Sequence, residues 1–166
     1  LPISCCAAFG GETAQAALTF AVLGILTVVA FMDIDTLEIY DRFPALLLVC
    51  GAAAQFVFPG PGIKSRLLGC VIVSLPMLLL ALVVPGGFGG GDIKLMFGAG
   101  FFLGARLTVV AAFLGILLGG GFGALLLAAK KADRKTRFAF GPFLCIGIAA
   151  AMFFGERLAD WYIGLL

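Results

Sequence analysis

The sequence contains no histidine, and only 12% of its 166 residues are charged. The lack of histidine excludes a Ser-His-Asp triad and a histidine general base, and it removes the main ligand of most catalytic zinc sites. Soluble domains contain about 25% charged residues, so the low charge argues against a water-soluble fold. The net charge of +2 also argues against a nucleic-acid partner.

CxxC pairs are absent as well, because none of the five cysteines has that spacing. Cys50, Cys70 and Cys145 lie inside apolar runs, where a thiol behaves as a small hydrophobic group. Cys5 and Cys6 are adjacent, which is not the spacing of a structural zinc site. We therefore expect neither a metal nor a cofactor.

Apolar residues dominate instead, at 63% of the chain with a mean hydropathy of +1.20. The first apolar run is too long for a signal-peptide core and follows no basic region, so we interpret it as a transmembrane helix. Two runs are shorter than the ~20 residues of a perpendicular span. We expect an all-α membrane protein, a polytopic bundle of about six transmembrane helices forming one domain over 1–166. The expected helices are 13–32, 44–58, 67–84, 93–105, 107–129 and 142–158.

Glycine is expected to act in two ways. Gly115 and the run 119–121 lie in the fifth apolar segment, where small residues permit close helix packing. The stretch 86–91 is expected to be a loop.

The distribution of basic residues predicts the orientation of the bundle. The loops after the first, third and fifth helices contain seven lysines and arginines, whereas the loops on the opposite side contain four. This excess places the loops after the first, third and fifth helices in the cytoplasm. Asp33 and Asp92 then lie on the same, cytoplasmic face. The seven are Arg42, Lys94, Lys130, Lys131, Arg134, Lys135 and Arg137; the four are Lys64, Arg66, Arg106 and Arg157.

Two acidic sites interrupt the apolar sequence. Asp92 follows Gly89-Gly90-Gly91, and the segment 33–41 contains four acids. An ionisable residue at a membrane boundary indicates a functional site, although Asp92 could equally be a helix cap and the other acids a solvated loop. Within the segment 33–41, Asp33 directly follows the apolar run and should lie deepest, with Asp35 about 200° round a helix from it.

Three motifs in order resemble the signatures of type IV prepilin peptidases, the GxGD aspartic peptidases. The segment 33–43 resembles the first signature, with Tyr40 and Asp41 replacing its proline and asparagine. Gly89–Leu95 matches GxGD-x-K-L, and Gly141-Pro142-Phe143-Leu144 matches the motif that begins the last helix.

This resemblance implies an aspartic endopeptidase of the inner membrane. It would remove the basic leader from type IV prepilins or the pseudopilins of type II secretion at the cytoplasmic face, so its partners would be these precursors and membrane lipid. The absence of two CxxC pairs implies the short, peptidase-only type without a methyltransferase domain, as in tight-adherence pilus systems. The implied catalytic residues are Asp33 and Asp92, supported by Gly89, Gly91, Lys94, Gly141 and Pro142.

The chemistry of two carboxylates supports the same mechanism. Neighbouring carboxylates cannot both ionise cheaply, so they share a proton: one then activates water and the other hydrogen-bonds the scissile carbonyl. Lys94 either biases this pair electrostatically or anchors its helix at the interface, and we favour anchoring.

Two alternatives are weighed against this interpretation. Tyr40-Asp41 and Pro44-Ala45-Leu46 resemble motifs of presenilin and signal-peptide peptidases, but there Pro-Ala-Leu follows the GxGD helix, and here it precedes it. A non-catalytic pilus-assembly subunit or small transporter is the other alternative. Such a scaffold should tolerate asparagine at Asp33 and Asp92, whereas a protease should not.

Overall fold

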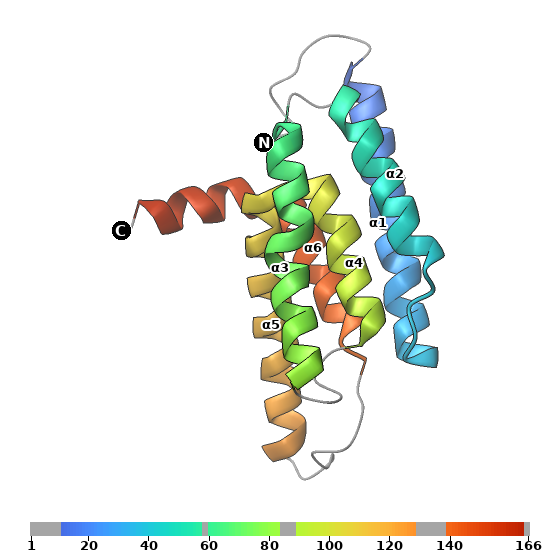
Figure 1. Cartoon of the computed structure of the whole chain (residues 1–166), viewed down its shortest axis with the longest axis vertical. Helices are drawn as coiled ribbons and strands as arrows, with labels where there is room; N and C mark the ends of the chain where they lie inside the picture. Colours follow the sequence, from blue (N-terminus) through green and yellow to red (C-terminus); the bar gives the residue numbers. More distant parts are fainter. Residues whose placement is uncertain (1–10, 58–59, 84–88, 129–138, 165–166) are drawn as a thin grey trace.

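The computed structural model describes residues 11–57, 60–83, 89–128 and 139–164, which form helices and no strand. All six expected helices are present (Figure 1). Their bounds are α1 Gly11–Thr36, α2 Arg42–Val57, α3 Ile63–Val83, α4 Gly90–Leu103, α5 Ala105–Ala128 and α6 Gly141–Ile163.

The lengths and surfaces of the helices are those of a polytopic all-α membrane protein. Four helices, α1, α3, α5 and α6, are long and apolar enough to cross a membrane. With 16 and 14 residues, α2 and α4 are shorter than the ~20 residues that a perpendicular span requires. Large apolar side chains point outward along the bundle, among them Phe20, Phe113 and Leu117, as expected where lipid is the solvent.

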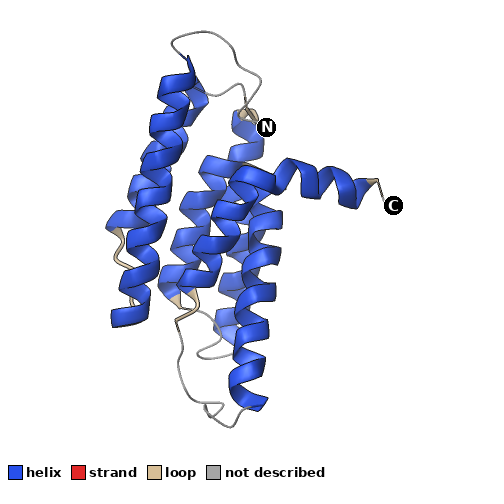
Figure 2. Cartoon of the chain, turned by 180° about the vertical axis from the view of Figure 1, so that it is seen from behind, coloured by secondary structure: helices blue, strands red, loops and turns tan. Residues whose placement is uncertain are grey.

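The central helix of the bundle is α4. It packs against α2, α3, α5 and α6, and its Leu95, Met96 and Ala99 are fully or almost fully buried. The end of α1 and the beginnings of α4 and α6 lie together at the lower end of the bundle in Figure 1. Viewed from behind, the last part of α6 projects away from the bundle axis (Figure 2).

Close backbone contacts through glycine fix the position of α4. Gly100 lies directly against the backbone of Gly69 in α3, and a Cβ at Gly98 would lie 2.6 Å from the Pro44 carbonyl oxygen of α2. The predicted packing role is confirmed for Gly115 and Gly119, which lie against Leu144 and Phe140. It is wrong for Gly120 and Gly121, because a Cβ at either position would meet no atom of the described residues within 4 Å.

Two helix boundaries differ from expectation in ways that concern the site. Helix α1 continues through Asp33 to Thr36, whose hydroxyl donates to the Met32 carbonyl oxygen over 2.8 Å, and Leu37 follows with a left-handed φ of 54°. Helix α4 begins at Gly90 instead of residue 93, so the predicted loop at 86–91 extends too far. Gly91 lies in this first turn and packs on Ile39, and only glycine fits there because a Cβ would lie 2.7 Å from the Ile39 Cβ.

Arg66, which was counted as a loop charge, lies within the first turn of α3 and is 1% exposed. Its guanidinium donates hydrogen bonds of 2.9–3.3 Å to the carbonyl oxygens of Pro61, Gly51, Phe101 and Phe102. One buried cation therefore ties together α2, α3 and the C-terminal turn of α4, where carbonyl groups lack helical partners. The basic segment 130–137, on which the orientation mostly depends, lies outside the described residues.

Candidate active site

Three helix ends meet around two carboxyl groups. Asp33 lies in the last turn of α1, Asp92 in the first turn of α4, and Gly141 is the first residue of α6. Both aspartates are only 6% exposed, although each belongs to a helix that is otherwise largely apolar. Burial of two acids at one end of a membrane bundle is costly, which marks this end as the candidate site.

The carboxylate of Asp33 is held by the beginning of α6. Its Oδ2 accepts a hydrogen bond of 2.8 Å from the backbone N–H of Gly141. A Cβ at Gly141 would lie 2.7 Å from that oxygen, so only glycine permits this approach. Asp33 lies at the C-terminal end of its own helix, which disfavours a negative charge, and the N-terminus of α6 offsets this effect.

The carboxyl group of Asp92 has one bonded and one unbonded oxygen. Its Oδ2 accepts a hydrogen bond of 3.3 Å from the backbone N–H of Gly89, which precedes α4. Its Oδ1 is buried and has no hydrogen-bond partner among the described residues. Buried polar atoms are rarely left unpaired, so this oxygen is available for a proton, a water molecule or a substrate group.

The two carboxyl groups interact electrostatically with each other, and the Cys145 thiol in α6 interacts with both. From the sequence alone, Cys145 is interpreted only as a small hydrophobic residue. Its position four residues after Gly141, on the same face of α6, was the signal that could have placed it beside the pair.

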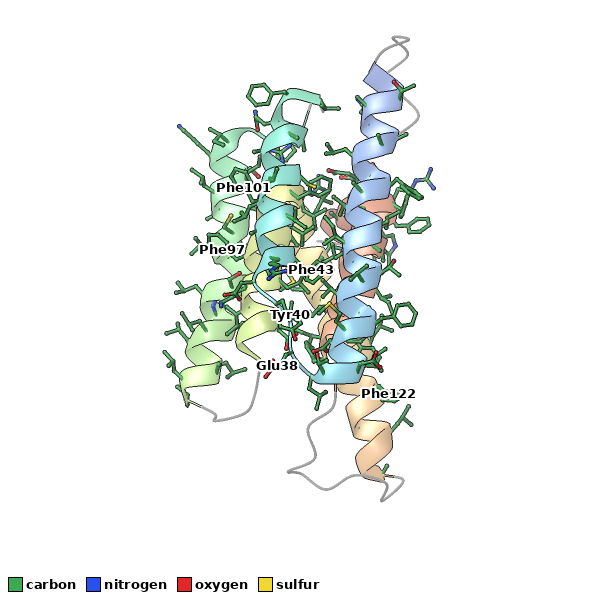
Figure 3. The ribbon with its side chains drawn as sticks, turned by 90° about the vertical axis from the view of Figure 1, so that its right-hand side faces the viewer. Glu38, Tyr40, Phe43, Phe97, Phe101 and Phe122 are labelled. Carbon is green, nitrogen blue, oxygen red and sulfur yellow. The ribbon has the colours of Figure 1, made fainter. Side chains whose placement is uncertain are left out.

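The other acids of the segment 33–41 face solvent. Asp35, Glu38 and Asp41 are exposed, which confirms that Asp33 is the deepest acid of this segment. Figure 3 shows Glu38 and Tyr40 on the link between α1 and α2.

The remaining predicted residues lie close to this end of the bundle. Gly89 supplies the N–H for Asp92, Gly91 permits the contact with Ile39, and Pro142 occupies the first turn of α6, where its missing N–H costs nothing. The Lys94 ammonium pairs with the Asp41 carboxylate at 2.6 Å, with side chains 56% and 74% exposed. In the described part of the chain, no three His, Cys, Asp or Glu side chains are grouped as a metal site requires.

Comparison with known proteins defines the family. The model of the type IV leader peptidase family matches residues 20–124, a segment that contains both aspartates and ends before Gly141. The chain belongs to this family. As a type IV leader peptidase family member with four long apolar helices, it is a multi-pass membrane protein of a protease family.

Its curated relatives are described as prepilin leader peptidase/N-methyltransferases. The Bacillus subtilis protein is 30% identical over 141 residues, covering 85% of this chain and 57% of the relative. The Legionella pneumophila protein is 28% identical, covering 93% and 55%, and the Pseudomonas aeruginosa protein is 27% identical, covering 92% and 54%. The chain thus spans about half the length of these relatives. No solved structure gives a significant match to it.

Proposed function

We propose that this protein is an aspartic endopeptidase that removes the basic leader from type IV prepilin or pseudopilin precursors, with Asp33 and Asp92 as its catalytic residues. The observation that carries the proposal is the pair of buried, interacting carboxyl groups at the meeting point of α1, α4 and α6. Membership of the leader peptidase family supplies the substrate class.

The different surroundings of the two carboxyl groups suggest a division of roles. Asp33 has the shorter backbone hydrogen bond, 2.8 Å against 3.3 Å, so it is the better candidate for the ionised group. Asp92 has the unbonded Oδ1, so it is the better candidate for the protonated group, which requires an acceptor for its O–H.

The reaction follows from this division. The Asp33 carboxylate takes a proton from water as the water oxygen attacks the scissile carbonyl carbon, and Asp92 donates its proton to the carbonyl oxygen. When the tetrahedral intermediate collapses, the C–N bond breaks and the leaving nitrogen receives a proton from Asp33. Asp92 takes a proton back from the intermediate, which restores the shared proton.

The proposed site faces the cytoplasm, in keeping with the excess of lysine and arginine on that side. The exposed carboxylates of Asp35 and Glu38 follow Asp33 in the chain and would attract a basic leader, whereas the charge of Asp41 is offset by its ion pair with Lys94. Such a leader stays on the cytoplasmic side when the pilin helix inserts. The family match gives no support to a presenilin-like protease.

Co-expression with a candidate prepilin tests this function. We expect the precursor to lose a leader-sized fragment, seen as faster migration on a gel and as a new N-terminus by mass spectrometry. A precursor that stays intact beside well-expressed enzyme, for every prepilin and pseudopilin of the source organism, would contradict the proposal.

A further inference from the structure

A groove opens on the outside of the bundle, between α2, α3 and α4. Its volume is about 490 Å³, and it is lined mainly by apolar side chains. Val71 and Leu75 of α3 and Phe97 of α4 form its walls and are 42–48% exposed. In Figure 3, Phe97 lies between the ribbons of α2 and α3. Because these walls face the surroundings of the bundle, the groove is accessible to a ligand within the membrane.

The floor of the groove is formed by small residues, one of which has an unsatisfied polar group. Cys70 and Ser74 lie one turn apart on α3 and are 3% and 6% exposed. The Ser74 hydroxyl oxygen is buried and has no hydrogen-bond partner in the described part of the chain. In an apolar environment an unpaired hydroxyl is costly, so this site is suited to a ligand that brings an acceptor.

A peptide helix fits these features better than a lipid chain does. Small residues spaced four apart let a second helix approach closely, and serine hydroxyls form hydrogen bonds between membrane helices. An acyl chain would fill the apolar walls, but it carries no acceptor for Ser74. The groove therefore favours a helical segment with a polar side chain or an accessible carbonyl at this depth.

The groove also leads to the two aspartates. Ile93 lines it, whereas Asp92, the preceding residue, faces the buried side of α4. Between these two faces lies the first turn of α4, where a Cβ at Gly90 would meet no atom of the described residues within 4 Å. Gly90 itself presents no side chain to a chain that leaves the groove and crosses this turn toward the carboxyl groups.

We propose that the groove between α2, α3 and α4 binds the apolar helix of the substrate, with the Ser74 hydroxyl bonded to it. The peptide before that helix crosses Gly90 in an extended form and presents the cleavage junction to Asp33 and Asp92. This inference rests on the proposed function and adds the place where the substrate helix binds.

Steady-state cleavage of a full-length precursor in detergent or proteoliposomes tests the groove with a matched pair of variants. Ala45 and Ala52 are exposed residues of α2, but only Ala45 lines the groove. Phenylalanine is introduced at each site in turn: Ala45→Phe should raise KM about tenfold at unchanged kcat, and Ala52→Phe less than twofold, the signature of lost ground-state binding. Equal KM values for the two variants would overturn the proposal.

Cross-linking tests the same groove without relying on turnover. A photoreactive amino acid is placed at Leu75 or at Leu80, which are 48% and 49% exposed but lie about 140° apart around α3. In the Asp92→Asn background, we expect the precursor's apolar segment to be captured from position 75 and not from position 80. Capture of phospholipid or of a second enzyme chain at position 75 would overturn the inference. If the wild-type enzyme leaves the precursor uncleaved, the proposed function fails and this inference falls with it.

Discussion

The Oδ2 of Asp33 accepts a hydrogen bond of 2.8 Å from the backbone N–H of Gly141, 108 positions further along the chain. This bond joins the end of the first helix to the beginning of the last, and it orients one carboxyl group of the proposed catalytic pair.

Replacing Gly141 with alanine should lower cleavage by at least ~10-fold, because its Cβ would lie 2.7 Å from the Asp33 Oδ2 and displace the carboxylate. Gly120→Ala is the matched control, since a Cβ there would meet no atom of the part of the chain that the structure describes within 4 Å. Initial rates of precursor cleavage measure the effect. Equal rates for the two variants would show that the contact with Gly141 does not position Asp33 for catalysis.

Asp33→Asn and Asp92→Asn should each reduce cleavage by roughly 100-fold or more, because each removes one proton-transfer partner of the pair. Asp35→Asn should retain activity, since Asp35 is exposed. Gel filtration in detergent checks that all three variants remain folded. An active Asp33→Asn enzyme beside an inactive Asp35→Asn enzyme would shift the site to the neighbouring acid, and full activity in all three would favour a scaffold.

Lys94→Ala should change cleavage less than about threefold and stability by no more than about 1 kcal/mol, because its ion pair with Asp41 is exposed. The rate and the thermal unfolding midpoint are the measurements. A loss of activity as large as that of Asp92→Asn would mean that Lys94 acts on the carboxyl pair electrostatically.

Arg66→Met should lower the free energy of unfolding by about 2–4 kcal/mol, since it removes the donor that four carbonyl groups share in the interior. Lys64→Met, at an exposed position in the same turn, should change it by less than about 0.5 kcal/mol. Thermal unfolding in detergent compares the two. Similar midpoints would show that the Arg66 bonds contribute little to stability.

Single cysteines in a cysteine-free background test the orientation. Glu38 is exposed at the end of the bundle that contains the two aspartates (Figure 3), and Lys64 is exposed in the first turn of α3, a helix that begins at the opposite end (Figure 1). A membrane-impermeant thiol reagent should label Lys64→Cys in intact cells, and Glu38→Cys only after the cells are opened. The reverse pattern would place the proposed site on the side that a cytoplasmic leader does not reach.

Much of the fold could be predicted because long apolar runs, broken by proline and glycine, have few structural solutions in a membrane. The six helices follow directly from those runs. The end of α1 was placed too early because Asp33 and Thr36 read as the start of a polar loop. Their helical state depends on the contact of Asp33 with Gly141 and on the Thr36 side-chain hydrogen bond to Met32, and a sequence pattern does not show such contacts.

The sequence predicts which aspartates and glycines belong to the candidate site, but it does not predict the contacts between them. The resemblance named Asp33, Asp92 and Gly141, but only the structure shows that the Gly141 N–H is bonded to Asp33. The burial of Arg66 could not be predicted, because its four carbonyl partners come from separate segments and backbone acceptors have no sequence signature. The ion pair of Lys94 with Asp41 likewise depends on the packing of α4 beside α2.

The tie between Asp33 and Gly141 also has a consequence for biosynthesis. Helices α1 and α4 are synthesised before α6. Both carboxyl groups therefore enter the membrane before the residue whose N–H orients Asp33 has been synthesised. The proposed site therefore stays incomplete while the earlier helices insert. The proposed site is assembled only when α6 has been made and packs beside α1.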